Sequence, residues 1–258
     1  MCAPAPKNSM IPWFQFTVVH LGPIPIQVWG FFVALGMVVS LLLLQNKTNN
    51  NPAQKKILDS AFWIIIWGFI GARLGHIIFY EPQYFLSNPI DIFKIWQGGM
   101  SSFGSFLGAG LSFFYYFKKN KFNVRELGDT FLLVSLPGWM IGRVGCFMIH
   151  DHLGAHSTCP LAIMTPDGPR LDMALLEILG LIPLAIWVYF SRKKKFASGT
   201  VSMIILAYYS ALRLILDFWR ATDIANSDAR YSGLTPAQYF SIIILLFAGW
   251  HFLKLRRK

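Results

Sequence analysis

The sequence predicts an all-α polytopic membrane protein with seven transmembrane helices, on three observations. Its 258 residues are 55% hydrophobic and only 14% charged, and its mean hydropathy is +0.49, which is too apolar for a soluble domain with a wetted surface. Seven apolar stretches are each long enough to cross a hydrocarbon core of about 30 Å. Basic residues gather in the short segments between them. We therefore expect one transmembrane domain over residues 1–258 and no separate soluble domain.

The expected spans alternate with polar segments along the chain. The stretch "QNKTNNNPAQKK" follows the first span and "KKNKFNVRE" follows the third. The third span opens on the glycine-rich "WQGGMSSFGSFLGAG". The longest segment outside the membrane is an outer loop at about 150–172. The spans are expected at residues 26–44, 57–80, 101–117, 127–149, 173–190, 200–219 and 235–253.

The orientation follows from the distribution of lysine and arginine. Fifteen of the 23 basic residues lie in the segments after the first, third, fifth and seventh spans, and five lie on the other side. Basic residues favour the cytoplasmic side of short loops. We therefore expect the N-terminus outside, in the periplasm, and the C-terminus in the cytoplasm, as an odd number of spans requires.

The net charge of +11 would suggest nucleic acid for a soluble protein. Here the positive residues cluster at span ends, so they are interpreted as topology signals and contacts with the lipid bilayer, and no nucleic-acid partner is expected. The cysteines Cys2, Cys146 and Cys159 show no metal-ligand spacing. We therefore expect no metal and no cofactor, and a Cys146–Cys159 disulfide is only a minor alternative.

Three arginines lie inside expected spans: Arg73, Arg143 and Arg213. Each costs roughly 2.5–3.5 kcal/mol near mid-bilayer, so each is expected to face a cavity or a partner. All three fall in the outer halves of their spans, where a layer of guanidinium groups can bind a lipid phosphate through bidentate hydrogen bonds. The competing interpretation is internal pairing or snorkelling to an interface. The carboxylates considered for such pairing are Asp59, Asp129, Glu177 and Asp217.

Glycines accompany these arginines. Gly142 and Gly145 flank Arg143 and allow close approach of a helix or a lipid headgroup. Gly98 and Gly99 precede the third span and are expected to shape a loop. Close helix packing through small residues four apart is the favoured interpretation of two further glycines, Gly104 and Gly108.

Several motifs, in the right order, resemble the bacterial prolipoprotein diacylglyceryl transferase family, a seven-span enzyme of the inner membrane. "LGPIPIQVWGFFVALG" is similar to the family's opening motif, "GARLGHIIFY" with "NPIDIFKIWQGGMS" to its second span and following loop, and "GRVGCF" to its G-R-x-G-N-F signature. "YSALRLILDFWRATD" resembles the family's Y-x-x-x-R-F-x-x-E-x-x-R-x-P-D segment. The resemblance covers nearly the whole chain.

The resemblance implies transfer of an sn-1,2-diacylglyceryl group from phosphatidylglycerol to the lipobox cysteine thiol of a preprolipoprotein, the first step of bacterial lipoprotein maturation. The implied partners are phosphatidylglycerol, a preprolipoprotein signal peptide and the lipid bilayer. The implied location is the bacterial cytoplasmic (inner) membrane, as a multi-pass protein. This chemistry needs thiolate character at sulfur and stabilisation of the departing phosphate.

The implied site residues divide into two groups. Candidate catalytic residues are Arg143, Arg213, Asp151, Tyr209 and His150. Candidate substrate-binding residues are Arg143, Arg73, Arg220, Gly98, Gly99, Gly142, Gly145, Trp29 and Glu177.

The chain departs from the family pattern where a base is expected. Phe103 replaces the histidine of the family's M-S-F-H-G-G stretch, Cys146 replaces the signature asparagine, and Asp151 replaces a glutamate. His150 and His152 flank Asp151 and are candidate replacements for the lost base, with His76 as a second choice. Cys146 is interpreted as an apolar filler, and a nucleophilic role is its alternative.

Because of these changes, the competing function is an inactive relative that binds anionic phospholipid or lipoprotein signal peptides. A transporter is the third candidate, because polar groups at membrane depth also mark translocation paths. The order of the motifs disfavours it.

Overall fold

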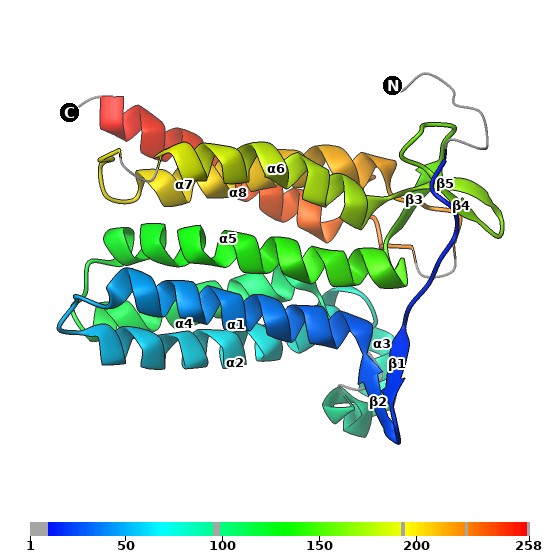
Figure 1. Cartoon of the computed structure of the whole chain (residues 1–258), viewed down its shortest axis with the longest axis horizontal. Helices are drawn as coiled ribbons and strands as arrows, with labels where there is room; N and C mark the ends of the chain where they lie inside the picture. The colour runs from blue at the N-terminus through cyan, green and yellow to red at the C-terminus, as the bar shows by residue number, and fades with distance from the viewer. Residues whose placement is uncertain (1–9, 95–98, 192–193, 225–226, 257–258) are drawn as a thin grey trace.

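The computed structural model describes residues 10–94, 99–191, 194–224 and 227–256. Long helices lie side by side along one axis, and the strands lie together at one end of the bundle (Figure 1). The described chain starts at the strand end, and the last helix finishes at the opposite end. The long helices are α1 (Val28–Thr48), α2 (Gln54–Phe79), α4 (Ser102–Lys119), α5 (Val124–Ile149), α6 (Met173–Ser191), α7 (Thr200–Leu216) and α8 (Pro236–Arg256).

These helices overlap the seven apolar stretches predicted from the sequence. Six of them, all except α4, are long and apolar enough to cross a membrane, as far as the described residues go. Large apolar side chains such as Phe31, Trp67, Leu111 and Phe247 remain exposed, as expected of helices whose outer surface faces lipid. The chain therefore has the architecture of a polytopic α-helical membrane protein.

The expectation of an all-α chain is incomplete at the strand end. The region expected as a loop at about 150–172 contains an antiparallel sheet in the order β3–β5–β4. Burial alternates along β5, where Arg170 and Asp172 are buried and Leu171 between them is less so, because successive side chains of a strand point to opposite faces. These strands are β3 (Leu153–His156), β4 (Ile163–Thr165) and β5 (Gly168–Asp172).

Two further short structures lie at this end. A hairpin of β1 (Val18–Leu21) and β2 (Ile24–Gln27) leads directly into α1. Between α2 and α4 the chain forms α3 (Pro82–Ser87) and a 3₁₀ turn, η2 (Pro89–Phe93). A second 3₁₀ turn, η4 (Asp217–Trp219), continues α7.

Close helix pairs are built on glycine. A Cβ atom added at Gly104 would lie 2.2 Å from the carbonyl oxygen of Gly71, and one added at Gly108 would lie 2.2 Å from that of Trp67. Both contacts are between α4 and α2, so the prediction that Gly104 and Gly108 allow close helix packing is confirmed. Helices α1 and α5 meet in the same way, because a Cβ at Gly36 would lie 2.3 Å from the carbonyl oxygen of Gly138.

The apolar core is divided along the bundle. One buried cluster lies toward the end opposite the strands and a second lies among α5, α6 and α7. The first contains Leu44, Ile57, Ala61, Phe117, Leu127 and Val134. The second contains Leu136, Leu181, Leu184 and Ile205. Polar side chains replace this second core as α5, α6 and α7 approach the strand end, and these form the candidate site.

Candidate functional site

The site is assembled where α5 ends, α6 begins and α7 ends. Helix α5 stops because His150 adopts a left-handed conformation, with φ 50°. Helix α6 begins directly after β5, and the Asp172 carboxylate accepts a hydrogen bond of 2.9 Å from the backbone N–H of Leu175, a typical N-cap arrangement. These boundaries place Glu177 about one turn into α6, facing α5 and α7.

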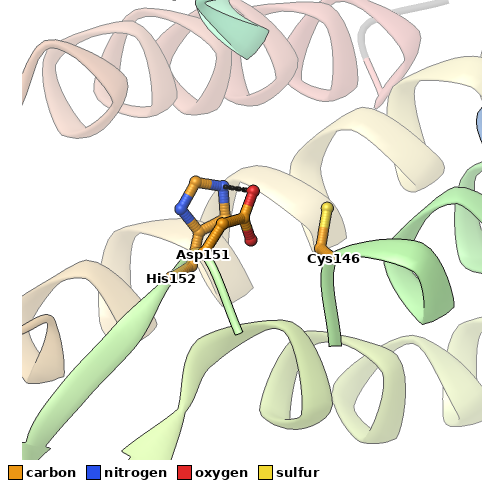
Figure 2. Close-up of side chains that lie close together, drawn as sticks. All are labelled: Cys146, Asp151 and His152. Carbon is orange, nitrogen blue, oxygen red and sulfur yellow. Dashed lines mark ion pairs between the residues drawn. The ribbon is translucent and has the colours of Figure 1, made fainter. Parts of the chain in front are cut away.

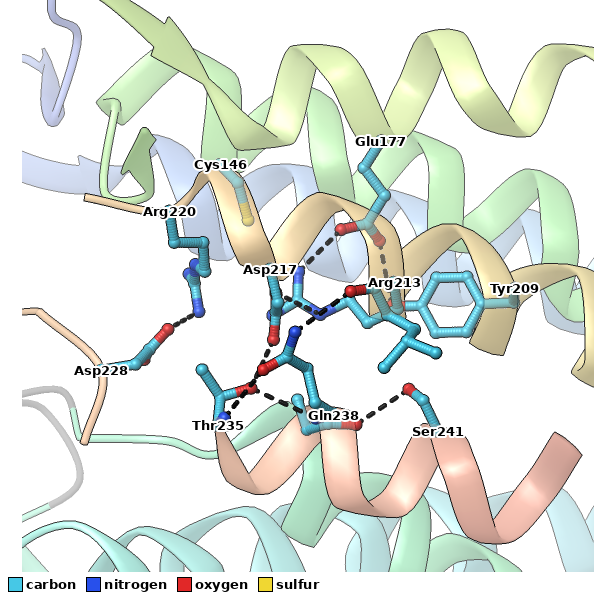
Figure 3. Close-up of polar contacts among 12 residues, drawn as sticks. Cys146, Glu177, Tyr209, Arg213, Asp217, Arg220, Asp228, Thr235, Gln238 and Ser241 are labelled. Atoms are coloured by element: carbon cyan, nitrogen blue, oxygen red, sulfur yellow. Dashed lines mark hydrogen bonds and ion pairs between the residues drawn. The ribbon is translucent and has the colours of Figure 1, made fainter. Parts of the chain in front are cut away.

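The buried carboxylate of Glu177 is the centre of the site (Figure 3). Its Oε1 accepts hydrogen bonds from Arg143 Nε at 2.8 Å, Trp139 Nε1 at 3.1 Å and the Tyr209 hydroxyl at 3.0 Å. Its Oε2 accepts from Arg213 Nη1 at 3.1 Å. Two buried guanidinium groups therefore share one carboxylate.

The guanidinium of Arg143 is only partly satisfied by this carboxylate. Its carbon lies 4.8 Å from the centre of the Trp139 ring, and its Nη1 donates weakly to Cys146 Sγ at 3.8 Å. Its Nη2 is buried and has no hydrogen-bond partner among the described residues. A buried cationic N–H without an acceptor costs free energy, so this nitrogen is a position where an anionic ligand would be stabilised.

Arg213 is held from a second side. Its Nε lies 3.3 Å from Asp217 Oδ1, and Asp217 Oδ2 accepts a hydrogen bond of 2.7 Å from Thr235 Oγ1. Gln238 Nε2 donates to the carbonyl oxygen of Leu214 at 3.1 Å. The start of α8 thereby fixes the end of α7, as Figure 3 shows.

A third arginine, Arg220, follows η4 and forms an ion pair with Asp228. Burial and the positive charge of Arg213 lower the pKa of Arg220 to about 10, so it remains charged at neutral pH. We call Arg143, Arg213, Arg220, Glu177 and Asp217 the arginine cluster. All three arginines are paired with carboxylates, so the cluster can take an added anion at Arg143 Nη2, which lacks an acceptor.

A polar pocket of about 100 Å³ opens beside this cluster. Partial desolvation raises the pKa of Asp151 to about 6, although the charge of Arg143 opposes that shift and the side chain is 34% exposed. Burial, with the charges of Arg220, Arg143 and Arg213, lowers the pKa of His152 well below its usual value, so its imidazole is neutral at pH 7. The pocket is lined by Asp151, His152, Leu153, Arg220, Ala221, Ile224, Ser227 and Asp228.

Arg73, the third arginine predicted for a phosphate site, has a different environment. Its side chain donates hydrogen bonds to the carbonyl oxygens of Ile92 at 2.9 Å, Asp91 at 2.5 Å and Gly99 at 3.1 Å. Its guanidinium also lies 5.0 Å from the Phe85 ring. These contacts hold the segment between α2 and α4, whereas Arg143 and Arg213 share a carboxylate.

His150 lies away from the pocket lining. Its Nδ1 is 2.8 Å from Asp172 Oδ2, and its ring packs on Trp13, Phe14 and Phe147. These contacts give His150 a packing role at the end of α5. Of the two histidines that flank Asp151, it is His152 that lines the pocket.

The predicted glycine and tryptophan positions lie mainly at helix contacts. A Cβ at Gly145 would lie 2.8 Å from Phe32 Cβ and 3.3 Å from Trp29 Cα, and one at Gly142 would lie 3.9 Å from Val33. Both glycines therefore face α1. Gly99 has φ +73° and accepts from Arg73, and Gly98 lies outside the described residues.

The structure also shows the surroundings of Cys146, Phe103 and His76, which the sequence analysis singled out. Cys146 is a free, buried cysteine, so the alternative Cys146–Cys159 disulfide is absent. Phe103 packs between the rings of Phe79 and Phe240 at 5.5 and 4.7 Å, in an apolar environment. The candidate base His76 stacks on Tyr80.

Sequence reasoning gave Trp139 no chemical role, because tryptophan is abundant in the chain and serves by default as interface or core. Its contact with Glu177 and Arg143 depends on the rotation of α5 and has no sequence signature. The contacts of Thr235 and Gln238 with α7 were also missed. The only signal in the sequence was that Thr235 and Gln238 are polar residues at the start of an apolar span.

These features define a class: an α-helical multi-pass membrane protein with a buried arginine cluster beside a polar pocket at one end of the bundle. The comparison with known families identifies which one. The profile of the prolipoprotein diacylglyceryl transferase family matches residues 17–254, and the chain belongs to this family.

Curated relatives agree over nearly the full length. A protein of Nitratidesulfovibrio vulgaris (strain DP4) named phosphatidylglycerol–prolipoprotein diacylglyceryl transferase is 29% identical over 248 residues, which cover 93% of this chain and 94% of the relative. Proteins of the same name from Idiomarina loihiensis and Pseudomonas putida (strain W619) are each 30% identical, and each match covers 93% of this chain with 94% and 95% of the relative, respectively.

Proposed function

We propose that this chain transfers a diacylglyceryl group from phosphatidylglycerol to the cysteine thiol of a prolipoprotein, the first step of lipoprotein maturation. Family membership and the names of the full-length relatives support this activity. The acceptor cysteine is proposed to belong to a lipobox in a preprolipoprotein signal peptide.

The observation that carries the proposal is the unpaired Nη2 of Arg143 within the arginine cluster. An anionic phosphodiester supplies the acceptor that this nitrogen lacks, and Arg213 and Arg220 supply further positive charge. Guanidinium groups bind phosphate oxygens through charge-assisted hydrogen bonds that strengthen as charge develops on the leaving group. We therefore assign Arg143 and Arg213 to stabilisation of the departing phosphate, and Arg220 to headgroup binding.

The remaining members of the site hold these cations in place. Glu177 orients both Arg143 and Arg213, and Tyr209 donates to the same carboxylate. Asp151 lines the pocket in which the thiol and the headgroup would meet. Arg73 supports the site indirectly, because its three carbonyl contacts fix the segment between α2 and α4.

We further propose seven membrane crossings, with α4 as the seventh beside the six apolar helices. Helix α4 has 18 residues and packs against α2 through glycine contacts. An odd number of crossings fits a described chain that begins at the strand end and finishes at the other. The entire chain, 1–258, then forms one transmembrane domain with the segment at about 150–172 as its largest outer part.

The proposed orientation places the strand end and the arginine cluster in the periplasmic half of the cytoplasmic (inner) membrane. The lysine-rich segments between α1 and α2 and between α4 and α5 lie at the opposite end of the bundle, which is then the cytoplasmic end. Phosphatidylglycerol of the outer leaflet reaches the arginine cluster at headgroup depth. Reporter fusions at residue 160 and at the C-terminus test the orientation, and cytoplasmic placement of residue 160 contradicts it.

A second candidate function has one observation in its favour. Phe103, which replaces the family histidine, is packed between two other phenylalanine rings, so no base occupies that position. A protein that retains the arginine cluster and lacks a base would bind anionic lipid or a signal peptide without transfer.

Complementation separates the two candidates. The chain is expressed in a strain depleted of its own transferase, and a reporter lipoprotein is examined by mass spectrometry for a thioether-linked diacylglyceryl group. We expect the modification with the unaltered chain and its loss with Arg143→Ala. Arg125→Ala is the matched control, because Arg125 is exposed and lies at the opposite end of the bundle. Normal membrane insertion without the modification supports the binding protein.

A further inference from the structure

A second group of side chains lies at the end of α5, and its chemistry differs from that of the arginine cluster. The left-handed conformation of His150 turns the chain after α5, and Asp151 and His152 come back toward Cys146 (Figure 2). One ligand atom from each of Cys146, Asp151 and His152 lies within 4.8 Å of the others. Asp151 Oδ2 and His152 Nε2 are 3.7 Å apart.

The donor set of thiolate, imidazole and carboxylate is one that zinc prefers. A tetrahedral zinc site with bonds of about 2.0–2.3 Å places its ligand atoms about 3.3–3.8 Å apart. The observed Asp151–His152 distance of 3.7 Å is slightly longer than the roughly 3.3–3.5 Å expected between an oxygen and a nitrogen ligand of zinc. The three ligand atoms, which lie within 4.8 Å of one another, would have to move closer together to bind the ion. The backbone of His152 is fixed, because its carbonyl oxygen accepts a hydrogen bond of 3.0 Å from the N–H of Met173.

The local charge also permits a divalent ion, although three arginines are near. Glu177 and Asp217 pair with Arg143 and Arg213, and Asp228 pairs with Arg220. The thiolate of Cys146 and the carboxylate of Asp151 would then neutralise the two charges of zinc. Arg143 Nη1, 3.8 Å from Cys146 Sγ, would donate to the bound thiolate.

Three protein ligands leave one position of a tetrahedral site open, which is typical of catalytic zinc. Asp151 and His152 also line the 100 Å³ pocket beside Arg220, so the open position can face that pocket. We propose that Cys146, Asp151 and His152 bind a zinc ion whose fourth position takes the thiol of the substrate cysteine and holds it as a thiolate. This inference rests on the proposed function for the identity of the thiol.

The step balances without any further reactant. The thiol loses its proton to solvent when it binds zinc, because metal coordination deprotonates thiols. The sulfur electron pair then forms the C–S bond to the glycerol carbon as the C–O bond to phosphate breaks. The bonding pair leaves with the phosphate oxygen, and glycerol phosphate takes up a proton from solvent. Zinc would thus replace the base lost at Phe103.

Metal binding is measured first, without reference to transfer. The full chain, purified in detergent with a tag free of histidine, is stripped with a chelator and titrated with zinc, and cobalt(II) is used as a spectroscopic probe. We expect one zinc per chain by elemental mass spectrometry and a sulfur-to-cobalt charge-transfer band. Cys146→Ser, which is nearly isosteric, and His152→Gln should each weaken zinc binding by more than about 10- to 100-fold, which is the loss typical of changing only an outer-shell partner. Cys146→Ser should also remove the band.

His156→Gln is the matched control, because His156 is exposed and contacts Asp223, away from the three ligands. A wild-type chain that binds no more zinc than Cys146→Ser overturns the site. Gel filtration and thermal unfolding show that each variant is folded.

Transfer to a lipobox peptide in phosphatidylglycerol vesicles is measured separately. Loss of transfer on chelation and recovery with zinc supports the role. Full transfer by the chelated chain overturns the role of zinc and leaves the proposed function intact. Zinc binding without transfer under any condition keeps the site and contradicts the proposed function.

Discussion

Two buried arginine environments at the same end of the molecule differ in how completely their guanidinium groups are hydrogen-bonded. Arg170, on β5, donates hydrogen bonds to two carboxylates. Asp223 accepts from Nη1 at 3.0 Å and from Nη2 at 2.6 Å, and Asp167 accepts from Nε at 2.7 Å. In the bundle, Arg143 and Arg213 share the carboxylate of Glu177, and Arg213 also contacts Asp217. Arg143 Nη2 has no partner in the described part of the chain.

The difference separates a structural arginine from a ligand-binding one. The guanidinium of Arg170 is fully bonded and joins the sheet to the segment after η4, so another anion would only compete with Asp223 and Asp167. The pair in the bundle lacks an acceptor and therefore gains from an added phosphate. Burial alone does not distinguish them, since Arg170 is 2% exposed and Arg143 is 5% exposed.

The largest expected effect comes from removing the shared carboxylate. Glu177→Ala leaves two buried guanidinium groups without their common partner, which is expected to cost about 3–5 kcal/mol of stability and to abolish transfer. Thermal unfolding of the purified protein in detergent measures the loss. Glu81→Ala is the control, because Glu81 is exposed. Unchanged unfolding of Glu177→Ala would mean that the arginines are solvated or differently paired.

Arg143→Lys is expected to fold and to lower transfer about 10- to 100-fold. Lysine keeps the charge but cannot reproduce the planar set of donors that bonds Glu177 and a phosphate oxygen together, and a charge-assisted hydrogen bond is worth about 1.5–3 kcal/mol. Initial rates with a lipobox peptide in phosphatidylglycerol vesicles measure the effect. Arg170→Lys should change those rates less than threefold, and equal losses in the two variants would contradict the comparison.

Arg170→Ala is expected to lower stability by about 1–2 kcal/mol through the loss of charge-assisted hydrogen bonds. The loss is limited because the two carboxylates it leaves behind are half exposed and can be solvated. Transfer per folded molecule should persist. Thermal unfolding gives the loss, and limited proteolysis between residues 157 and 168 should become faster. A loss of transfer with normal stability would place Arg170 in the substrate site.

The smallest effect concerns acid stability of the sheet. Hydrogen bonds from Arg170 lower the pKa of Asp167 to about 2 and also lower that of Asp223. A carboxyl whose pKa is depressed on folding contributes stability above its unfolded value of 3.8, and this is lost as pH falls from about 4 to about 2. Asp167→Asn should therefore flatten the decline in unfolding temperature between pH 5 and 2. Glu81→Gln controls for removing an exposed carboxylate, and an identical decline in Asp167→Asn contradicts the assignment.

The sequence by itself determined the positions of the long helices. Apolar content over a window of about 20 residues is a local property that survives in any packing arrangement, so α1, α2 and α4 to α8 overlap the predicted stretches. It also identified Arg143 and Arg213 as exceptional, because a charge in an apolar stretch requires a partner wherever the helix packs. The family motifs indicated which of these positions belong to one site.

The tertiary structure alone decided how those residues meet. That Arg143 and Arg213 share Glu177, with Trp139 beneath one of them, depends on the rotation of three helices about their own axes, which hydropathy leaves free. That Arg170 pairs with Asp223, 53 residues away, depends on a sheet whose short strands carry no long periodic signal.

The approach of Cys146 to Asp151 and His152 depends on a single left-handed residue, His150, at the end of α5. Spacing in the sequence gave no metal site, because a helix followed by a reversed chain brings together side chains that would diverge if the helix continued. Local composition thus fixed the helices of this protein, and the directions of side chains across helix ends and between distant segments fixed its site.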